Sequence, residues 1–281
     1  MLATLKEVLE KAEQGNYAVG AFNCTSLESG MAIVETAEEL NSPVILQYAD
    51  SHRHLISIDV IGPIMLQLAK IAKVPVVVHL DHGASIESCR HAVDMGFTSV
   101  MYDASAKPFE DNVAETRSVV EYAHERGASV EAELGHILTS KAGAAEGNGK
   151  SYTREEAYTD PEMAKEFIER TNVDALAIGF GTAHGIYTEK PVLDLNRIAL
   201  IKSAKDIPHV MHGGSGLSEE EYRTAIHNGI RKINYYTYLS LAGGRGVMQY
   251  LEDKKDKDAI YFEDIAKAGI TAMKADVKRA M

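Results

Sequence analysis

The sequence is poor in cysteine and proline. Its 281 residues are 45% hydrophobic and include 2 cysteines and 7 prolines, which excludes a disulfide framework and argues against a fibrous or disordered chain. Cys24 and Cys89 are not spaced as a CxxC pair. We therefore expect two ordinary reduced thiols and assign neither of them to a functional site.

Long apolar runs and clusters of basic residues are also missing. No apolar segment approaches the roughly 20 residues of a membrane span, and Lys6, Glu7 and Glu10 stand where a secretory signal needs an apolar stretch. The 29 basic and 41 acidic residues give a net charge of −12. This balance argues against nucleic-acid and membrane partners. We expect a cytoplasmic protein that binds an anion only through local groups.

Short β-branched segments recur along the chain at fairly even intervals. Several of them are near-continuous apolar runs, which are typical of strands buried on both faces of a parallel sheet. The eight predicted strands begin at Tyr17, Val44, Val74, Ser99, Ser129, Ala175, Pro208 and Ile230.

Segments with helical periodicity separate these strands. Asp160 followed by Pro161 is a helix start signal, two pairs have the spacing of a capping box, and three glycines stand where helices should end. The pairs are Thr25 with Glu28 and Ser218 with Glu221, and the glycines are Gly96, Gly127 and Gly229. Strands and helices therefore alternate.

Eight strand–helix units in about 250 residues predict an α/β fold, the closed (β/α)8 TIM barrel. Because no linker-like segment divides the chain, we predict a single domain over residues 1–281. A doubly wound open sheet is the alternative, but it usually carries a glycine fingerprint after its first strand. Here the first strand runs into Phe22, Asn23 and Cys24.

The longest segment without a clear element follows the fifth strand, over about residues 136–158. Its glycines and small residues predict a mobile loop over the strand ends, with surface disorder as the alternative.

Histidines follow three of the predicted strands at their C-terminal ends, where this kind of barrel places its active site. His82 follows the third strand, His184 the sixth and His212 the seventh. A single histidine near a strand end is more often a hydrogen-bonded structural residue than a metal ligand. Together at one mouth, three neutral imidazoles form a catalytic-type zinc site that leaves a fourth position for substrate or water.

Carboxylates are expected at the same rim. Asp81 precedes His82, and strand alternation turns the two side chains in different directions, so that one binds metal and the other handles protons. Orientation of a neighbouring histidine is the alternative role for Asp81. Asp103 follows the fourth strand, and Glu131 and Glu133 share one face of the fifth. Glu133 is thus placed to orient a ligand or to bind metal itself.

A glycine-rich turn, GGSG, follows the seventh strand directly and comes before the capped helix start at Ser218. Backbone N–H groups of such a turn and of a helix N-terminus bind phosphate, and the loops after strands seven and eight are the usual phosphate site of this barrel. The residues that we expect there are Gly213, Gly214, Ser215, Asn234 and Thr237.

Together these motifs resemble the class II, zinc-dependent aldolases of fructose- and tagatose-1,6-bisphosphate, over nearly the whole chain. The resemblance is carried by AFNCTS from Ala21, VHLDHG from Val78, MYDAS from Met101, VEAELG from Val130, GTAHGIY from Gly181, HGGSGL from His212 and KIN from Lys232.

The resemblance implies that His82, His184 and His212 bind the catalytic Zn²⁺ and that Asp81 is the acid/base at the C4 oxygen of the substrate. Asp103 and Glu133 match a second metal position of some members, and a monovalent cation often lies near the substrate phosphate. The residues that match positions around the dihydroxyacetone phosphate moiety are Gly185, Gly213, Ser215, Asn234 and Thr237, and Asn23 is expected to bind substrate as well.

The implied reaction is reversible retro-aldol cleavage of a phosphorylated ketose to dihydroxyacetone phosphate and an aldehyde, by a homodimer or homotetramer. Three alternatives stay open: a metal hydrolase, a sugar-phosphate-binding relative without turnover, and a class I aldolase that uses Lys232. The hydrolase is disfavoured because the first strand lacks an HxH pair, and the class I mechanism because a zinc enzyme needs no Schiff-base lysine.

Departures from the family pattern concern substrate rather than reaction. Tyr235 and Tyr236 stand after Asn234, where the family has a small or acidic residue at the second position, and Ala49 replaces a polar residue after strand two. The family's flap glutamate, thought to move the C3 proton, has no counterpart before Glu146, so that base is left unassigned.

The last part of the chain departs too. A helix is expected after strand eight, but glycine in a helix interior costs about 1 kcal/mol relative to alanine. We therefore predict that the helix begins late or that the loop before it is long, because of Gly243, Gly244 and Gly246.

Overall fold

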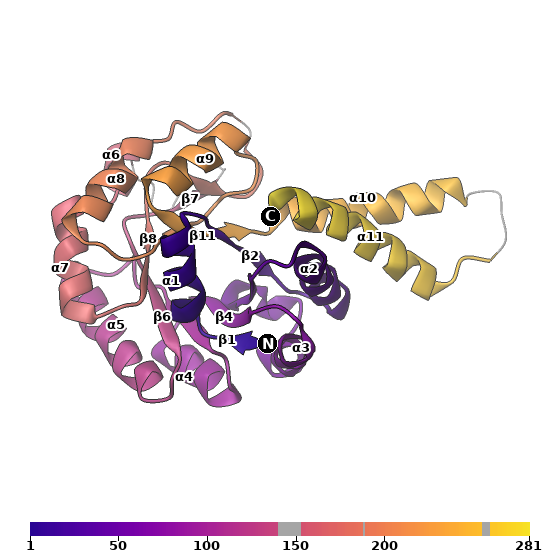
Figure 1. Ribbon diagram of the computed structural model, residues 1–281, viewed down its shortest axis with the longest axis horizontal. Helices are drawn as coiled ribbons and strands as arrows, with labels where there is room; N and C mark the ends of the chain where they lie inside the picture. The colour runs from indigo at the N-terminus through magenta and orange to yellow at the C-terminus, as the bar shows by residue number, and fades with distance from the viewer. Residues whose placement is uncertain (140–152, 188, 255–258) are drawn as a thin grey trace.

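The computed structural model describes residues 1–139, 153–187, 189–254 and 259–281 (Figure 1). Eight parallel strands follow one another around a ring in the order β4-β3-β2-β11-β10-β8-β6-β5, and β5 pairs back with β4. The ring strands are β2 (Val19–Asn23), β3 (Val44–Ala49), β4 (Val76–Gly83), β5 (Ser99–Tyr102), β6 (Ser129–Leu134), β8 (Ala175–Ile178), β10 (His209–Met211) and β11 (Ile230–Tyr235). This closure confirms the predicted (β/α)8 barrel and excludes the open sheet.

Three short strands lie outside the ring and were not predicted. β1 (Leu2–Ala3) pairs in parallel with the beginning of β4, at Val76 and Val77. β7 (Leu138–Thr139) pairs with β9 (Ala183–His184) in a separate two-stranded sheet. β9 matters for the site because it carries His184.

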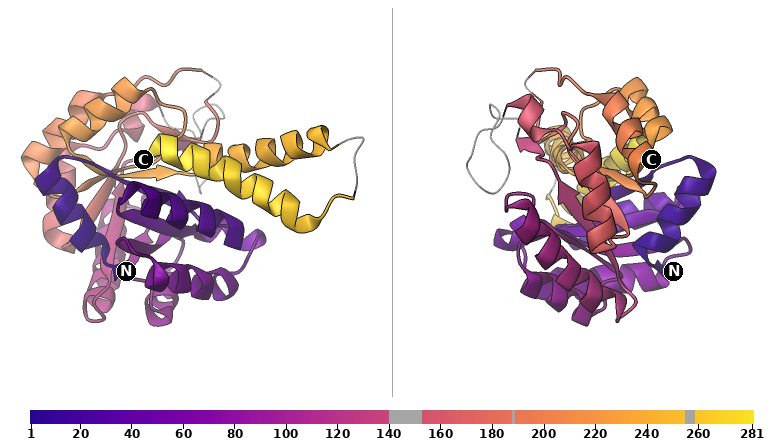
Figure 2. Two further views of the ribbon diagram at one scale, coloured as in Figure 1. Left: turned by 45° about the vertical axis from the view of Figure 1, so that its right-hand side comes forward. Right: turned by 90° about the vertical axis from the view of Figure 1, so that its left-hand side faces the viewer.

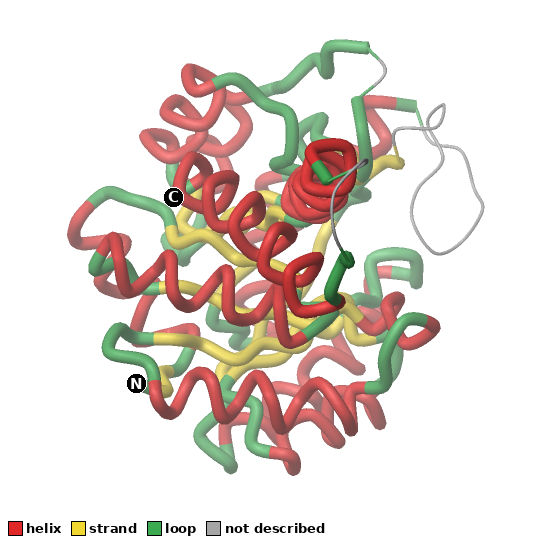
Figure 3. Tube along the Cα trace, turned by 90° about the vertical axis from the view of Figure 1, so that its right-hand side faces the viewer, coloured by secondary structure: helices red, strands yellow, loops and turns green. Residues whose placement is uncertain are grey.

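Helices surround the barrel, with the strands inside (Figure 3). The segments are α1 (Leu5–Gly15), α2 (Leu27–Leu40), the 3₁₀ turn η1 (Asp50–His54), α3 (Ile58–Ile71), α4 (Ile86–Met95), α5 (Phe109–His124), α6 (Arg154–Ala157), α7 (Pro161–Thr171), α8 (Leu195–Ala204), α9 (Glu219–Asn228), α10 (Thr237–Asp253) and α11 (Phe262–Ala280). Within the described ranges, no helix is both long and apolar enough to cross a membrane.

The expected helix ends are largely confirmed. The Asp160 side chain caps α7, the Ser218 and Glu221 side chains form the capping box of α9, and Gly96 and Gly229 end α4 and α9. The box expected at Thr25 and Glu28 is wrong by one residue, because Ser26 caps α2 and pairs with Ser29. In the looplike segment 136–158, β7 and α6 occupy the described ends, and residues 140–152 lie outside the described part.

The prediction that the helix after β11 begins late, or that the loop before it is long, is wrong. α10 begins at Thr237 and runs through all three glycines. A Cβ on Gly246 would meet Ala268 and Ala272, and one on Gly243 would meet Met273. Gly243 and Gly246 therefore let α10 pack closely against α11, and this tertiary contact offsets their poor helix propensity, whereas a Cβ on Gly244 would meet nothing. The two helices form a hairpin that projects from the barrel (Figure 2).

The interior of the barrel is apolar at its N-terminal end. There Leu5, Val8 and Leu9 of α1 pack against inward-facing strand residues such as Ile45 and Val77. A second and larger apolar layer lies between the strands and the outer helices. Because α1 covers one end, the open end of the barrel is where the strands finish.

Candidate active site

A cavity opens at the C-terminal end of the barrel, where the sequence predicted it. It is lined by the ends of β2, β3 and β4, by β9, and by the segments after β10 and β11. Of the predicted site residues it collects Asn23, Asp81, His82, His184, Gly185, Gly213, Ser215, Asn234 and Thr237. Six different strands thus contribute their ends, or the residues just after them, to one pocket.

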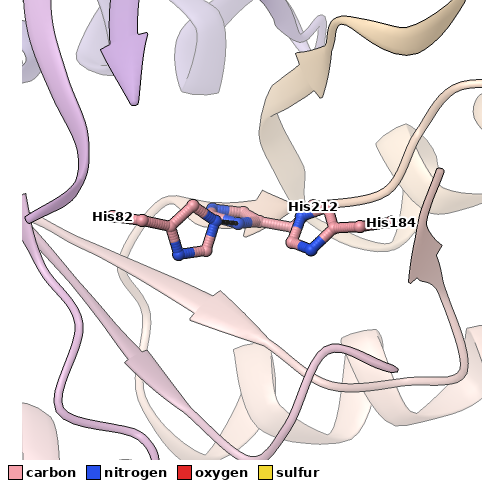
Figure 4. A group of neighbouring side chains, drawn as sticks. All are labelled: His82, His184 and His212. Carbon is pink, nitrogen blue, oxygen red and sulfur yellow. Dashed lines mark hydrogen bonds between the residues drawn. The ribbon is translucent and has the colours of Figure 1, made fainter. Parts of the chain in front are cut away.

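The three predicted histidines meet in this cavity (Figure 4). Nδ1 of His212 lies 2.9 Å from Nε2 of His82, and the ring centroids of His82 and His184 are 5.2 Å apart. One ring nitrogen from each of the three lies within 4.8 Å of the others. Three imidazole nitrogens this close match the donor set of a catalytic zinc site, whose Zn–N distances are about 2.0–2.1 Å.

The backbone at the end of β4 departs from strand geometry to make this possible. His82 has a φ of +47°, in the left-handed region that non-glycine residues seldom adopt. As a result Asp81 and His82 both line the cavity, although they are adjacent in the chain. The two side chains nevertheless have different partners, because Asp81 bonds to Asn23, Gln47 and Asn234 whereas His82 bonds to Asp103 and His212. Strained backbone of this kind clusters at functional sites.

Negative charge surrounds the histidines. Nδ1 of His82 lies 2.8 Å from Oδ2 of Asp103, and Nδ1 of His212 lies 3.8 Å from Oε2 of Glu133. Burial alone would lower the pKa of His82, but Asp81, Asp103 and Glu133 outweigh it and raise that pKa well above its usual value. The surroundings of His82 therefore favour positive charge, which suits a divalent cation.

The ring of His212 is oriented by the buried carboxylate of Glu131. Its Nε2 lies 2.9 Å from Oε1 of Glu131, and Oε2 of that carboxylate lies 2.8 Å from Nζ of Lys232. All three side chains are fully buried. The carboxylate fixes which nitrogen of the ring faces the cavity, as carboxylates behind metal-bound histidines commonly do.

Asp81 is held by three side-chain amides. Oδ2 accepts hydrogen bonds from Nδ2 of Asn23 at 3.0 Å and Nε2 of Gln47 at 3.3 Å, and Oδ1 accepts one from Nδ2 of Asn234 at 3.0 Å. Burial alone would raise the pKa of Asp81, but positive charge on His82, His212 and Lys232 outweighs it and lowers that pKa. The group therefore stays a carboxylate at neutral pH, in a fixed orientation.

The glycine-rich turn after β10 packs against the strand that carries His184. Gly213 has a φ of +65°, and a Cβ there would meet the backbone of Ala183 in β9. Tyr187 links the same two segments, because its hydroxyl accepts from the Ala183 N–H at 2.8 Å and donates to the Gly213 carbonyl at 2.9 Å. Gly214 lies just outside the cavity lining, and its N–H donates to the Asn234 carbonyl at 3.3 Å.

Comparison with known proteins decides the family. The model of the family described as "Fructose-bisphosphate aldolase class-II" matches residues 3–281. The chain belongs to this family. As predicted, it is a class II aldolase, a lyase of carbohydrate metabolism, and zinc dependence is a property of this family.

Named relatives agree with this assignment. A fructose-bisphosphate aldolase of Geobacillus stearothermophilus is 41% identical over 279 residues, which cover 98% of this chain and 94% of that one. One from Staphylococcus aureus is 40% identical over 261 residues, 91% of this chain and 88% of its own. The crystal structure of the YdjI aldolase from Escherichia coli K12 superposes with a TM-score of 0.85 at 34% identity, covering 100% of this chain and 96% of that one.

The structure separates the two tyrosines of this aldolase that follow Asn234. Both tyrosines border the cavity, but the ring of Tyr235 packs edge-on against Phe22 and its hydroxyl donates to Asp276 of α11 at 2.9 Å. Tyr236 lines the cavity, and its ring lies against that of His52.

Family membership disfavours the metal-hydrolase alternative. Lys232 is ion-paired beneath the histidines and does not line the cavity, which disfavours the lysine mechanism.

Three contributors were missed in the sequence: Gln47, Tyr187 and His52. Gln47 pairs in register with Asn23 on the neighbouring strand, and it is a polar residue in an otherwise apolar strand. That interruption was the available signal. Tyr187 stands within the GTAHGIY motif, but its two backbone partners come from segments that only the folded chain brings together. Nothing local to η1 pointed to His52.

Proposed function

We propose that His82, His184 and His212 hold the catalytic Zn²⁺ of this aldolase and that Asp81 is its acid/base. The convergence of one ring nitrogen from each histidine within 4.8 Å carries the proposal. When bound, the ion supplies Lewis-acid stabilisation of the negative charge that carbon–carbon cleavage leaves on the ketose oxygens.

Asp81 then serves the C4 oxygen. In the cleavage direction its carboxylate accepts the C4 hydroxyl proton, and in condensation it returns that proton to the aldehyde oxygen. The amides of Asn23, Gln47 and Asn234 hold the carboxylate in place, so no reorientation is needed between the two directions. General acid–base catalysis of this kind contributes about 10²–10⁴-fold to rate.

The phosphate of the ketose is proposed to lie between the glycine-rich turn and the start of α10. Tyr236 precedes α10 without a side-chain capping hydrogen bond, and Thr237 in its first turn lines the cavity. The N–H groups of that turn are therefore suited to an anion, as helix N-termini are in general. Gly185, Gly213 and Ser215 line the same side of the barrel mouth, and Gly214 shapes the turn.

A second cation position is proposed at His82, Asp103 and Glu133. One ligand atom from each of these residues lies within 4.8 Å of the others. His82 belongs to both groups and can serve them with different ring nitrogens, since its Nδ1 lies beside Asp103 and its Nε2 beside His212. A monovalent cation near the substrate phosphate, as the family resemblance implies, remains a prediction.

We also propose that residues 1–281 form one domain. We further propose that the enzyme assembles as a homodimer or homotetramer through the projecting hairpin of α10 and α11. α11 returns from the tip to pack on α2 of the barrel. Met248 and Phe262 on the hairpin are 72% and 78% exposed, an unusual exposure for large apolar side chains. Light scattering of Phe262→Glu should show a smaller assembly than that of the unaltered enzyme.

The decisive experiment is a retro-aldol assay on a panel of ketose 1-phosphates and 1,6-bisphosphates. We expect triose phosphate to be released, activity to fall to background after chelation, and Zn²⁺ to restore it. Activity that survives complete metal removal would contradict the zinc proposal. Borohydride in the presence of substrate should leave no adduct on Lys232. Binding of dihydroxyacetone phosphate without turnover on any substrate would favour the non-catalytic alternative.

A further inference from the structure

Two tyrosines hold the glycine-rich turn after β10 from outside the cavity. The Tyr187 hydroxyl donates to the Gly213 carbonyl at 2.9 Å. The hydroxyl of Tyr222, on α9, donates to the Gly214 carbonyl. Among the residues that the structure describes, the cavity lining includes Gly213 and Ser215 but neither tyrosine. Two successive carbonyls of the turn are therefore bonded to groups outside the cavity.

The geometry of the peptide group turns these bonds into a direction for the N–H groups. A trans peptide points its N–H opposite to its carbonyl. In the Gly213–Gly214 peptide that N–H donates to the Asn234 carbonyl at 3.3 Å and is thus occupied. In the Gly214–Ser215 peptide the carbonyl is bonded to Tyr222, so the Ser215 N–H points away from that tyrosine.

The Ser215 N–H is available to a ligand. Within the described part of the chain it has no hydrogen-bond acceptor, and Ser215 lines the cavity while being only 5% exposed. A buried N–H group without an acceptor is costly, and an anion in the cavity would satisfy it.

The start of α9, in contrast, is unsuited to an anion. The Glu221 N–H already donates to the Ser218 hydroxyl at 3.3 Å. Glu219, Glu220 and Glu221 put three negative charges in the first turn, which repel a phosphate. What α9 contributes instead is Tyr222. Side chains of a helix lean toward its N-terminus, so a residue this early in α9 can reach back to the turn that precedes it.

The two hydroxyls are fixed donors. Burial raises the pKa of Tyr222, and it raises the pKa of Tyr187 to about 12. Both therefore keep at neutral pH the protons that they donate to the turn. The turn is also packed closely, because a Cβ on Gly214 would lie 2.9 Å from Cγ2 of Ile233 and 3.3 Å from the Tyr222 hydroxyl oxygen.

We propose that Tyr222 is a positioning residue for the substrate phosphate, since it holds the Gly214 carbonyl outside the cavity and thereby aims the Ser215 N–H at the anion. Tyr187 acts in the same way on Gly213, but its hydroxyl also accepts from the Ala183 N–H beside His184. Tyr222 therefore affects the phosphate position without a bond to the segment that carries a zinc ligand. This inference rests on the phosphate position proposed above.

The first test is Tyr222→Phe, which keeps the ring and removes only the hydroxyl. The phosphate takes no part in bond cleavage, so its contacts contribute alike to the ground state and the transition state. We expect the KM of the phosphorylated ketose to rise about three- to tenfold, the effect of one net hydrogen bond, with kcat and zinc content within about twofold of the unaltered enzyme. An unchanged KM would overturn the proposal.

The second test separates positioning from a general structural role. Dihydroxyacetone phosphate and dihydroxyacetone differ only in the phosphate, and calorimetry measures their dissociation constants without turnover. In Tyr222→Phe we expect the constant of dihydroxyacetone phosphate to rise about three- to tenfold and that of dihydroxyacetone to stay within about twofold. Equal weakening of both ligands would mean that the whole cavity has loosened, and it would overturn the positioning role.

Tyr122→Phe is the matched control, because the Tyr122 hydroxyl donates to Asp94 at 2.7 Å on the outside of the barrel. It should leave KM and both dissociation constants unchanged. Tyr187→Phe should weaken dihydroxyacetone phosphate and also lower zinc affinity, because its hydroxyl bonds beside His184.

Failure of the proposed function gives a different result from failure of this inference. If the unaltered enzyme binds dihydroxyacetone phosphate no more tightly than dihydroxyacetone, the phosphate position itself is refuted, and the role of Tyr222 with it. If no ketose is cleaved but Tyr222→Phe weakens only the phosphorylated ligand, the aldolase proposal fails and the positioning role is supported.

Discussion

Lys232 and Glu131 form an ion pair inside the barrel, with Nζ 2.8 Å from Oε2 and both side chains fully buried. The other carboxylate oxygen of Glu131 lies 2.9 Å from Nε2 of His212. Burial alone would raise the pKa of Glu131, but Lys232, His212 and His79 outweigh it and lower that pKa to about 2. The carboxylate beside His212 thus stays charged because Lys232, which reaches it from β11, stabilises it.

Removing the lysine should therefore destabilise the fold. Lys232→Met leaves the Glu131 charge buried beside histidines alone, and breaking a buried pair in this way costs about 3–5 kcal/mol of unfolding free energy. Urea unfolding measures the loss. Glu131→Gln/Lys232→Met should recover a large part of it. The exposed pair of Arg117 and Glu121, 2.9 Å apart, is the control, and Arg117→Met should cost no more than about 1 kcal/mol. Equal losses from both pairs would contradict this account.

Replacing the Glu131 carboxylate should lower the zinc affinity more than it lowers turnover at saturating Zn²⁺. In Glu131→Gln the amide keeps the size of the side chain but loses the charge that fixes the ring of His212. We expect zinc affinity to fall about 10–100-fold, the usual effect of losing such a partner. Competition with a chromophoric chelator measures the affinity. At saturating Zn²⁺ much of the turnover should return, and an unchanged affinity would contradict the positioning role.

Asp81 and His212 should separate catalysis from metal binding. Asp81→Ala removes the proposed acid/base but none of the three imidazoles, so we expect zinc content to stay near that of the unaltered enzyme and turnover to fall at least 10²-fold. His212→Ala should lose both zinc and turnover. Metal analysis and the retro-aldol assay on the same preparations check this, and full zinc retention in His212→Ala would remove that residue from the ligand set.

The Gly213 position should not tolerate a side chain. Gly213→Ala places a Cβ against the Ala183 backbone at a φ of +65°, so β9 and His184 must shift. We expect at least a tenfold loss of kcat/KM together with lower zinc affinity. Gly244→Ala is the matched control, because a Cβ there meets nothing within 4 Å. Its helix-interior position predicts a stability gain of up to about 1 kcal/mol with kinetics unchanged.

A buried histidine far from the cavity should make stability depend on pH. Burial, reinforced by the charge of Lys202, lowers the pKa of His209 to about 3. Between pH 6.5 and 3 the unfolded chain therefore binds a proton there that the folded chain does not, and stability falls as the pH falls through this window. His209→Leu should flatten the dependence by up to about 1.4 kcal/mol per pH unit between pH 6 and 4.

Urea unfolding at a series of pH values measures that slope. His227→Leu, which removes an exposed histidine, is the control for the loss of one imidazole. An unchanged slope in His209→Leu would show that His209 takes up its proton in the folded state as readily as in the unfolded one.

The sequence by itself determined the barrel and the end of the barrel that carries the site. It also determined which three histidines, His82, His184 and His212, meet there. Apolar strand runs and strand–helix alternation are local patterns, and placing functional groups at strand ends is a rule of the fold. The tertiary structure alone decided the rest. It turned His82 into left-handed backbone beside Asp81, placed Lys232 behind Glu131, and brought His52 against Tyr236. It also carried α10 through its glycines. These features depend on contacts between segments distant in the chain, whose energies outweigh local propensity and strand alternation.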